Sequence, residues 1–125
     1  SRWLNGSILI DDTYNANPDS TKKAIDLLSN YKKNTVLVLG DMLELGRYKK
    51  KLHKEVGVYA KNKGVNIILG YGDLTKYAVD GFGKKAIFFK DEENLKSYLK
   101  ENITSKDVIL IKGSRGMKME KFKNV

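Results

Sequence analysis

The most informative segment of the sequence is residues 108–116, VILIKGSRG. Its first four residues form a short apolar run, rich in β-branched side chains and without polar alternation, which is typical of a strand covered on both faces. Its last five residues contain two glycines, a hydroxyl and two positive charges. Backbone N–H groups in such a loop approach an anion closely, and arginine offers a bidentate fork. The segment predicts a buried strand followed by an anion-binding loop, or by a loop that only turns the chain.

Strands and helices alternate along the rest of the chain. Similar apolar runs occur at residues 8–10, 35–39, 65–69 and 86–89. Apolar residues recur with a helical period over residues 18–31, 48–63, 74–79 and 91–101. This alternation predicts an α/β fold with an open, mostly parallel sheet and helices on both faces. Asn5-Gly6 is a strong hairpin signal, so we expect an antiparallel N-terminal strand at an edge of the sheet.

The composition fits one ordinary folded domain over residues 1–125. Hydrophobic residues make up 41% of the chain and charged residues 31%, which excludes a low-complexity sequence. The chain has no cysteine, which excludes a thiolate nucleophile and cysteine-ligated zinc. No apolar run approaches the roughly 20 residues of a membrane span, and residues 1–6 lack the apolar stretch of a signal peptide. We therefore expect a cytoplasmic protein.

The net charge is strongly positive, with 24 Lys and Arg against 15 Asp and Glu, or +9. Such a charge could attract nucleic acid, an anionic membrane surface or a phosphate-rich substrate. The basic residues are spread out and lack the aromatic interleaving of RNA-binding motifs. We expect a solvated lysine-rich surface, with no nucleic-acid and no membrane partner. A basic nucleic-acid-binding module stays as one alternative function.

Polar loops follow four of the predicted strands. They are residues 11–18 (DDTYNANP), 40–46 (GDMLELG), 70–73 (GYGD) and 112–116 (KGSRG). The carboxyl ends of parallel strands meet at one edge of an open sheet, where ligands bind. We therefore expect these loops to converge into a site. A phosphate loop of the pattern Gly-x-x-x-x-Gly-Lys-Ser/Thr does not occur in the sequence, so any ATP phosphates must be held elsewhere.

Several residues of these loops have a plainer interpretation beside a functional one. Asp11 and Asp12 could bind a metal, a ribose or an amine, or one of them could only anchor the turn. Asn17 could only cap the helix that starts at Pro18. In the second loop, Asp41 and Glu44 are the polar candidates, whereas Met42 and Leu45 could fold back onto the core. The single histidine, His53, lies within a predicted helix, where a surface or structural role is favoured over a general base.

The same positions also imitate a phosphoacceptor receiver domain. Such a domain has an acidic pair after its first strand, an aspartate after a central strand and a lysine after the last. Asp11, Asp12, Asp41 and Lys112 reproduce that set. However, Asp41 follows the second parallel strand where a receiver uses the third, and Lys112 is followed by glycine rather than proline. A receiver-like domain is therefore the second alternative function.

Four segments together resemble the C-terminal domain of Mur ligases, and in particular of the members that add D-alanyl-D-alanine. They are residues 10–20 (IDDTYNANPDS), 37–46 (LVLGDMLELG), 52–57 (LHKEVG) and 112–120 (KGSRGMKME). Residues 2–6 and 71–106 carry no such motif. The resemblance implies a Rossmann-like domain that closes as a lid over an N-terminal domain and a central ATPase domain, both absent from this chain.

The resemblance also implies a reaction. ATP phosphorylates the terminal carboxylate of UDP-N-acetylmuramoyl-tripeptide, and the amine of D-Ala-D-Ala attacks the acyl phosphate to form an amide bond during peptidoglycan precursor synthesis. ATP and Mg²⁺ serve the full-length enzyme, but the Mg²⁺ ligands belong to the central domain, so no metal site is expected here. The expected partners are the chain's own other domains and the two substrates. We expect a monomer, and an inactive chain when this domain is isolated.

The resemblance assigns roles to residues of three loops. Arg115 and Lys112 are expected to be catalytic, facing the transferred phosphate or a substrate carboxylate. The nucleotide-binding residues are expected to be Asp12, Tyr14, Asn15 and Asn17. The substrate-binding residues are expected to be Asp41, Met42 and Glu44, at a flank of the dipeptide site, and Ser114, which faces the phosphate or a substrate carboxylate together with Lys112 and Arg115.

Overall fold

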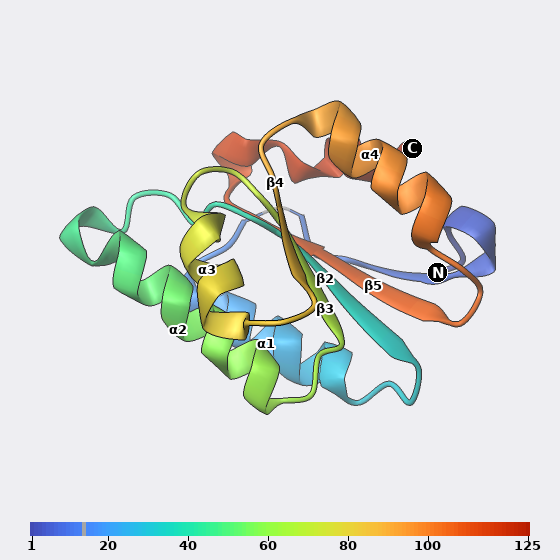
Figure 1. Ribbon diagram of the computed structural model, residues 1–125, viewed down its shortest axis with the longest axis horizontal. Helices are drawn as coiled ribbons and strands as arrows, with labels where there is room; N and C mark the ends of the chain where they lie inside the picture. Colours follow the sequence, from blue (N-terminus) through green and yellow to red (C-terminus); the bar gives the residue numbers. More distant parts are fainter. Residues whose placement is uncertain (14) are drawn as a thin grey trace.

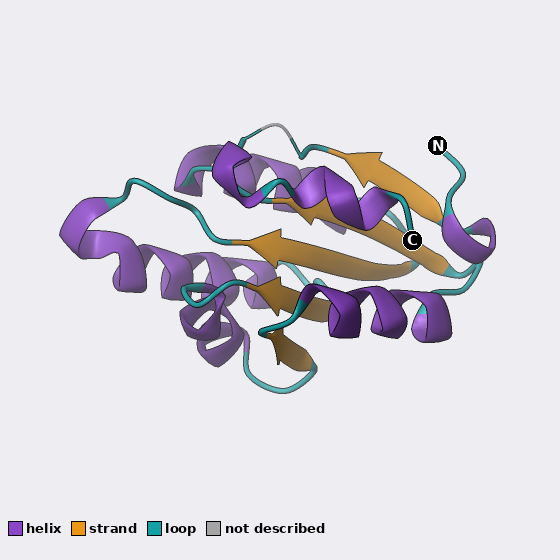
Figure 2. Cartoon of the chain, turned by 90° about the horizontal axis from the view of Figure 1, so that it is seen from above, coloured by secondary structure: helices purple, strands orange, loops and turns teal. Residues whose placement is uncertain are grey.

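The computed structural model describes residues 1–13 and 15–125. Within these residues the strands form one five-stranded sheet in the order β1-β5-β2-β3-β4, with every neighbouring pair parallel (Figure 1). The strands are β1 (Ile8–Asp11), β2 (Asn34–Gly40), β3 (Ile67–Tyr71), β4 (Ala86–Phe89) and β5 (Asp107–Lys112). All five point to the same edge of the sheet (Figure 2). The predicted α/β class and the parallel, Rossmann-like open sheet are confirmed.

Helices cover both faces of the sheet, as predicted. One face carries α1 (Pro18–Ser29), α2 (Lys49–Asn62) and α3 (Thr75–Phe82), and the other carries α4 (Glu92–Asn102) and the 3-10 helix η4 (Met119–Lys123) (Figure 1). Alternate residues of β2 serve the two layers, because Leu37 and Leu39 pack under α1 and α2 whereas Val36 and Val38 pack under α4 and η4. This two-sided burial explains why the strands read as unbroken apolar runs.

Local capping chemistry sets where the helices begin. The Asn17 side chain accepts a hydrogen bond from the Ser20 N–H at 2.8 Å, and the Ser20 hydroxyl accepts one from the Asn17 N–H at 3.1 Å. This reciprocal pair satisfies two N–H groups that a helix start leaves open. Asp91 caps α4 with its side chain alone, accepting from the N–H groups of Glu93 and Asn94. The predicted capping role of Asn17 is therefore confirmed.

The antiparallel N-terminal edge strand is not confirmed. Arg2 makes only an isolated antiparallel bridge with Ile8, and a short 3-10 helix, η1 (Leu4–Gly6), follows. Asn5 and Gly6 adopt the positive φ angles that a tight turn needs, 56° and 84°. However, the Trp3 indole donates to the carbonyl of Lys123 at 2.8 Å, and the Asn5 amide donates to the carbonyl of Ile103 at 2.9 Å. These contacts hold residues 3–5 against η4 and the end of α4, so the segment does not extend along β1 as a strand.

Helices α2 and α3 touch backbone to backbone at Gly57. A Cβ atom at this position would lie 2.0 Å from the carbonyl oxygen of Ala78, well inside van der Waals contact. The close approach fixes how α2 lies on the sheet, and α2 in turn borders the loop that follows β2.

We predict that Gly57→Ala lowers the free energy of unfolding by about 1–3 kcal/mol, because the overpacked methyl group outweighs alanine's better helix propensity. Urea denaturation of the 125-residue chain measures the change. Val58→Ala, at the next and exposed position of α2, is the matched control and should stay within about 0.5 kcal/mol of wild type. A Gly57→Ala chain as stable as wild type would show that α2 and α3 do not pack this closely.

Candidate functional site

Three loops meet at the carboxyl edge of the sheet, and Ser114 joins them. The Ser114 N–H donates to the carbonyl of Asp41 at 3.0 Å. Its hydroxyl accepts from the Leu43 N–H at 2.7 Å and donates to the carbonyl of Ala16 at 3.2 Å. The loops after β1, β2 and β5 are thus tied to a single side chain, and their predicted convergence is confirmed.

These loops enclose a pocket of about 540 Å³. Its lining is Asn15, Ala16, Asn17, Leu43, Glu44, Leu45, Ser114, Arg115 and Gly116. The pocket therefore offers a guanidinium, a carboxylate and two side-chain amides around apolar groups, and Leu43 is 39% exposed there. A small ligand that carries charge of both signs and a short apolar part matches this chemistry.

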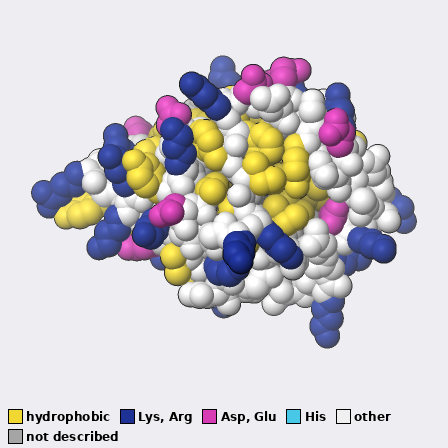
Figure 3. All heavy atoms as spheres, in the orientation of Figure 1, with side chains coloured by type: hydrophobic (Ala, Val, Ile, Leu, Met, Phe, Trp, Pro, Cys, Tyr) yellow, Lys and Arg dark blue, Asp and Glu magenta, His cyan; other side chains and the backbone are white. Residues whose placement is uncertain are grey.

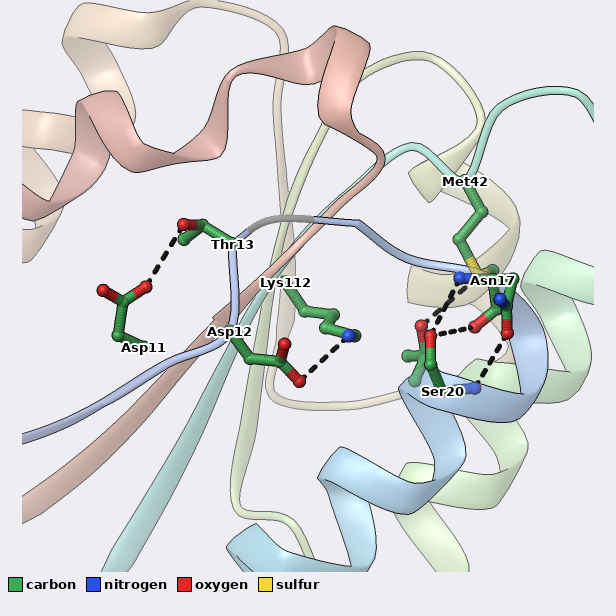
Figure 4. Close-up of polar contacts among 8 residues, drawn as sticks. Asp11, Asp12, Thr13, Asn17, Ser20, Met42 and Lys112 are labelled. Carbon is green, nitrogen blue, oxygen red and sulfur yellow. Dashed lines mark hydrogen bonds and ion pairs between the residues drawn. The ribbon is translucent and has the colours of Figure 1, made fainter.

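Lys112 and Asp12 form an ion pair at the ends of β5 and β1 (Figure 4). The Lys112 ammonium lies 2.9 Å from a carboxylate oxygen of Asp12. The Lys112 side chain is only 3% exposed, whereas that of Asp12 is 44% exposed. Because a buried ammonium needs a partner, Lys112 holds the Asp12 carboxylate in place and leaves its outer side accessible to a ligand. The predicted catalytic role of Lys112 stays a prediction. Because its side chain is buried against Asp12, any effect of Lys112 on a ligand would pass through the Asp12 carboxylate.

Asp11, the neighbour of Asp12, has a different set of partners. Its carboxylate lies 2.8 Å from the ammonium of Lys123. It also accepts a hydrogen bond from the Thr13 hydroxyl at 3.1 Å, which Figure 4 shows. The hydrogen bond from Lys123 holds the pKa of Asp11 below its usual value. Asp11 therefore anchors the C-terminal helix η4 to β1, which is the plainer of the two interpretations of this acidic pair.

Asp41 and Met42 lie outside the pocket lining. The Asp41 carboxylate accepts from the N–H groups of Leu74 and Thr75 at 3.0 and 3.1 Å, so it caps the start of α3. Burial raises the pKa of this carboxyl. Met42 is fully buried, with its sulfur 3.6 Å from the hydroxyl of Thr21. Their assignment to the dipeptide side stays a prediction, and the side chains show that these two residues shape the loop from within.

Five other predicted site residues line the pocket, and their assigned roles stay predictions. They are Asn15, Asn17, Glu44, Ser114 and Arg115. Tyr14 lies outside the described residues. Across the described ranges, 1–13 and 15–125, no group of three or more His, Asp or Glu side chains is arranged to hold a metal ion.

The receiver-like alternative is not supported. A receiver needs an accessible aspartate beside its lysine, but the carboxylate of Asp41 is buried against the start of α3, and Lys112 pairs with Asp12 instead. The face shown in Figure 3 does not support the nucleic-acid alternative either, because its Lys and Arg side chains lie apart from one another, beside apolar side chains, and form no continuous basic patch there. Among the described helices, none is long and apolar enough to span a membrane.

His53 contributes to the site in a way that sequence reasoning did not find. It is fully buried on α2, and its Nε2 accepts the N–H of Met42 at 2.9 Å. Its Nδ1 lies 2.6 Å from the carbonyl oxygen of Lys49. A carbonyl only accepts and a backbone N–H only donates, so the ring is neutral with its proton on Nδ1. The structural role that the sequence favoured for His53 is confirmed. The spacing along the helix could have indicated its burial, because the buried face of α2 consists of His53, Val56, Gly57 and Ala60.

A family model described as "Mur ligase, glutamate ligase domain" matches residues 2–115. The chain therefore belongs to this family of Mur ligase domains. The UDP-N-acetylmuramoyl-tripeptide–D-alanyl-D-alanine ligase of Bacillus subtilis is 39% identical over 125 residues, which cover 94% of this chain and 27% of that protein. The Escherichia coli protein of the same name is 37% identical over 115 residues, covering 90% and 25%.

Solved structures agree with this assignment. MurF from Acinetobacter baumannii superposes with a TM-score of 0.86 at 30% identity, covering 94% of this chain and 27% of that one. MurF from Thermotoga maritima, in complex with ADP, gives a TM-score of 0.79 at 28% identity, covering 97% and 28%. The chain spans about a quarter of the length of the relatives that it matches.

We predict that the free energy of unfolding falls as the pH drops below about 6.5, because burial lowers the pKa of His53. Below this pH the histidine of the unfolded chain binds a proton, whereas the buried histidine of the folded chain stays neutral. This part of the stability is therefore complete above the pKa of the unfolded histidine and is lost on acidification. The loss is at most about 1.4 kcal/mol per pH unit. Urea denaturation between about pH 7.5 and pH 5.5 measures the slope.

His53 is the only histidine of the chain, so His53→Gln should remove most of that slope. Asp41 acts in the opposite sense, since a carboxyl with a raised pKa costs stability as it ionises, but it is present in both chains. An equal slope in wild type and His53→Gln would contradict the assignment of a buried, neutral ring.

Proposed function

We propose that this chain is the lid domain of an ATP-dependent ligase that joins D-alanyl-D-alanine to UDP-N-acetylmuramoyl-tripeptide, in the cytoplasmic synthesis of peptidoglycan precursors. The observation that carries the proposal is the pocket at the carboxyl edge. Three of the segments that resemble the family converge there, and they supply both charges and amides around one space. The relatives with this ligase name are similar over almost the whole chain.

The proposed reaction needs the rest of the protein. ATP phosphorylates the terminal carboxylate of the tripeptide, and the amine of D-Ala-D-Ala then displaces phosphate to form the amide. In this proposal the central domain supplies the phosphate loop and the Mg²⁺ ligands, and the N-terminal domain binds the UDP-sugar. The lid closes over both, which excludes water from a hydrolysable acyl phosphate and brings fixed positive groups to the developing charge.

The residues that line the pocket, and Asp12 outside its lining, each have a part in this proposal. Asp12, held by buried Lys112, is positioned to accept hydrogen bonds from the ribose of ATP, while Asn15 and Asn17 offer amides to the nucleotide. Glu44 and Arg115 place opposite charges around one space, which suits a dipeptide with an ammonium and a carboxylate. Leu43 offers an apolar surface for an alanine methyl group.

Substitution of Arg115 gives the sharpest test of the proposal. In the full-length ligase, Arg115→Lys keeps a positive charge but loses the bidentate fork. If the guanidinium contacts the transferred phosphate, we predict a kcat lower by about ten- to a thousandfold; if it contacts only the dipeptide carboxylate in the ground state, the KM for D-Ala-D-Ala should rise alone. Steady-state kinetics with ATP and D-Ala-D-Ala varied separately distinguish the two.

Arg47→Lys is the matched control, because Arg47 lies outside the pocket lining and contacts the neighbouring Tyr48 hydroxyl at 2.8 Å. It should keep kcat and both KM values within about twofold of wild type. If Arg115→Lys and Arg115→Ala also stay within that range, Arg115 does not take part in the reaction.

The isolated 125-residue chain should neither hydrolyse ATP nor form an amide bond. It should bind ATP only in the millimolar range or more weakly, because a lid alone makes part of the contacts while association still costs several kcal/mol. Calorimetric titration and a phosphate-release assay measure both properties, with the full-length ligase as the positive control. Micromolar binding or steady ATP turnover by the isolated chain would overturn the assignment as a lid.

A further inference from the structure

The pocket wall at Leu43 and Glu44 belongs to a segment without regular secondary structure, between β2 and the 3-10 helix at Gly46. Two successive backbone N–H groups fix this segment from opposite sides. Met42 N–H donates to Nε2 of His53, and Leu43 N–H donates to the hydroxyl of Ser114. The first bond ties the segment to α2, and the second ties it to the loop after β5.

Glu44, the next residue, needs such support. Its φ angle is 62°, in the left-handed region that costs a residue with a Cβ atom about 1–2 kcal/mol. A conformation of this kind persists only where the surroundings hold it. The bonds at Met42 and Leu43 are backbone anchors immediately before Glu44, and Leu43 and Glu44 both line the pocket.

His53 provides one of these anchors and does not line the pocket itself. Its two ring nitrogens are both engaged, and the ring has no exposed surface. It therefore cannot contact a substrate. The bond from Nδ1 to the Lys49 carbonyl, within the same helix, fixes both the tautomer and the ring orientation, so that Nε2 presents a lone pair to Met42.

We propose that His53 is a positioning residue for the dipeptide side of the pocket. Through the backbone of residues 42–44 it sets the placement of Glu44 and Leu43, and it does so without touching the ligand. This inference rests on the proposed function, because the dipeptide is the ligand that the proposed function assigns to that wall. It predicts a selective defect, since Asp12, on the nucleotide side, is held by its ion pair with Lys112 and not by His53.

The test uses the full-length ligase with two substitutions at His53. Leucine has a similar size but no acceptor, so His53→Leu leaves the Met42 N–H without its partner. Glutamine carries an amide oxygen as many bonds from Cα as Nε2, so His53→Gln can restore that bond. We expect His53→Leu to raise the KM for D-Ala-D-Ala about tenfold or more while the KM for ATP changes less than about twofold, and His53→Gln to recover most of the loss.

Ile109→Val is the control for a general loss of stability, because Ile109 is fully buried in the α4 layer, away from the loop. It should lower the Tm without separating the two KM values. If the wild-type enzyme is active and His53→Leu leaves the KM for D-Ala-D-Ala unchanged, His53 does not have this role. An equal rise of both KM values in His53→Leu, or a His53→Gln enzyme that recovers none of the loss, also overturns it. A wild-type enzyme that joins no dipeptide overturns the proposed function itself.

Discussion

The hydrogen bonds of Ser114 hold the carboxyl edge of the domain together. Strand β5 lies between β1 and β2, so the residue that follows it by two positions reaches the loops of both neighbours. This contact requires β5 and β2 to end very close to each other. A Cβ atom at Gly113 would lie 3.1 Å from the Cα of Gly40 and 2.5 Å from the Met119 side chain, so glycine is needed where the ends of these two parallel strands meet η4. The pocket exists because the backbones can approach this far.

The charged residues at this edge differ in whether they line the pocket. Lys112 and Lys123 are committed to Asp12 and Asp11, and Asp41 is committed to the start of α3. The pocket itself is lined by Glu44 and Arg115. Because the Lys112 side chain is buried while Asp12 is half exposed, loss of Asp12 would leave a buried ammonium without its partner, and the pair therefore holds Asp12 in place for any ligand contact. The charged residues of this edge therefore comprise some that hold the loops from within and others that line the pocket.

Much of this organisation could be predicted from the sequence, because parallel sheets leave a clear pattern. The five apolar runs correspond to β1–β5, the four helical patterns correspond to α1–α4, and the loops after the strands converge as expected. The directions of individual side chains could not be predicted in the same way. Position after a strand places a residue at the edge, but whether Lys112 or Asp41 then points to solvent depends on which neighbours pack against it. The anchor at His53 was equally hidden, since it requires α2 to lie beside the loop after β2.

The central claim is that the pocket between the loops after β1, β2 and β5 closes over the dipeptide and the nucleotide. The most direct measurement is a crystal structure of the full-length ligase with UDP-N-acetylmuramoyl-tripeptide, D-Ala-D-Ala and a non-hydrolysable ATP analogue. The account predicts dipeptide density against Glu44, Leu43 and Arg115, with the ribose of the nucleotide at Asp12. A ternary complex in which the dipeptide is bound while this pocket faces solvent would contradict it.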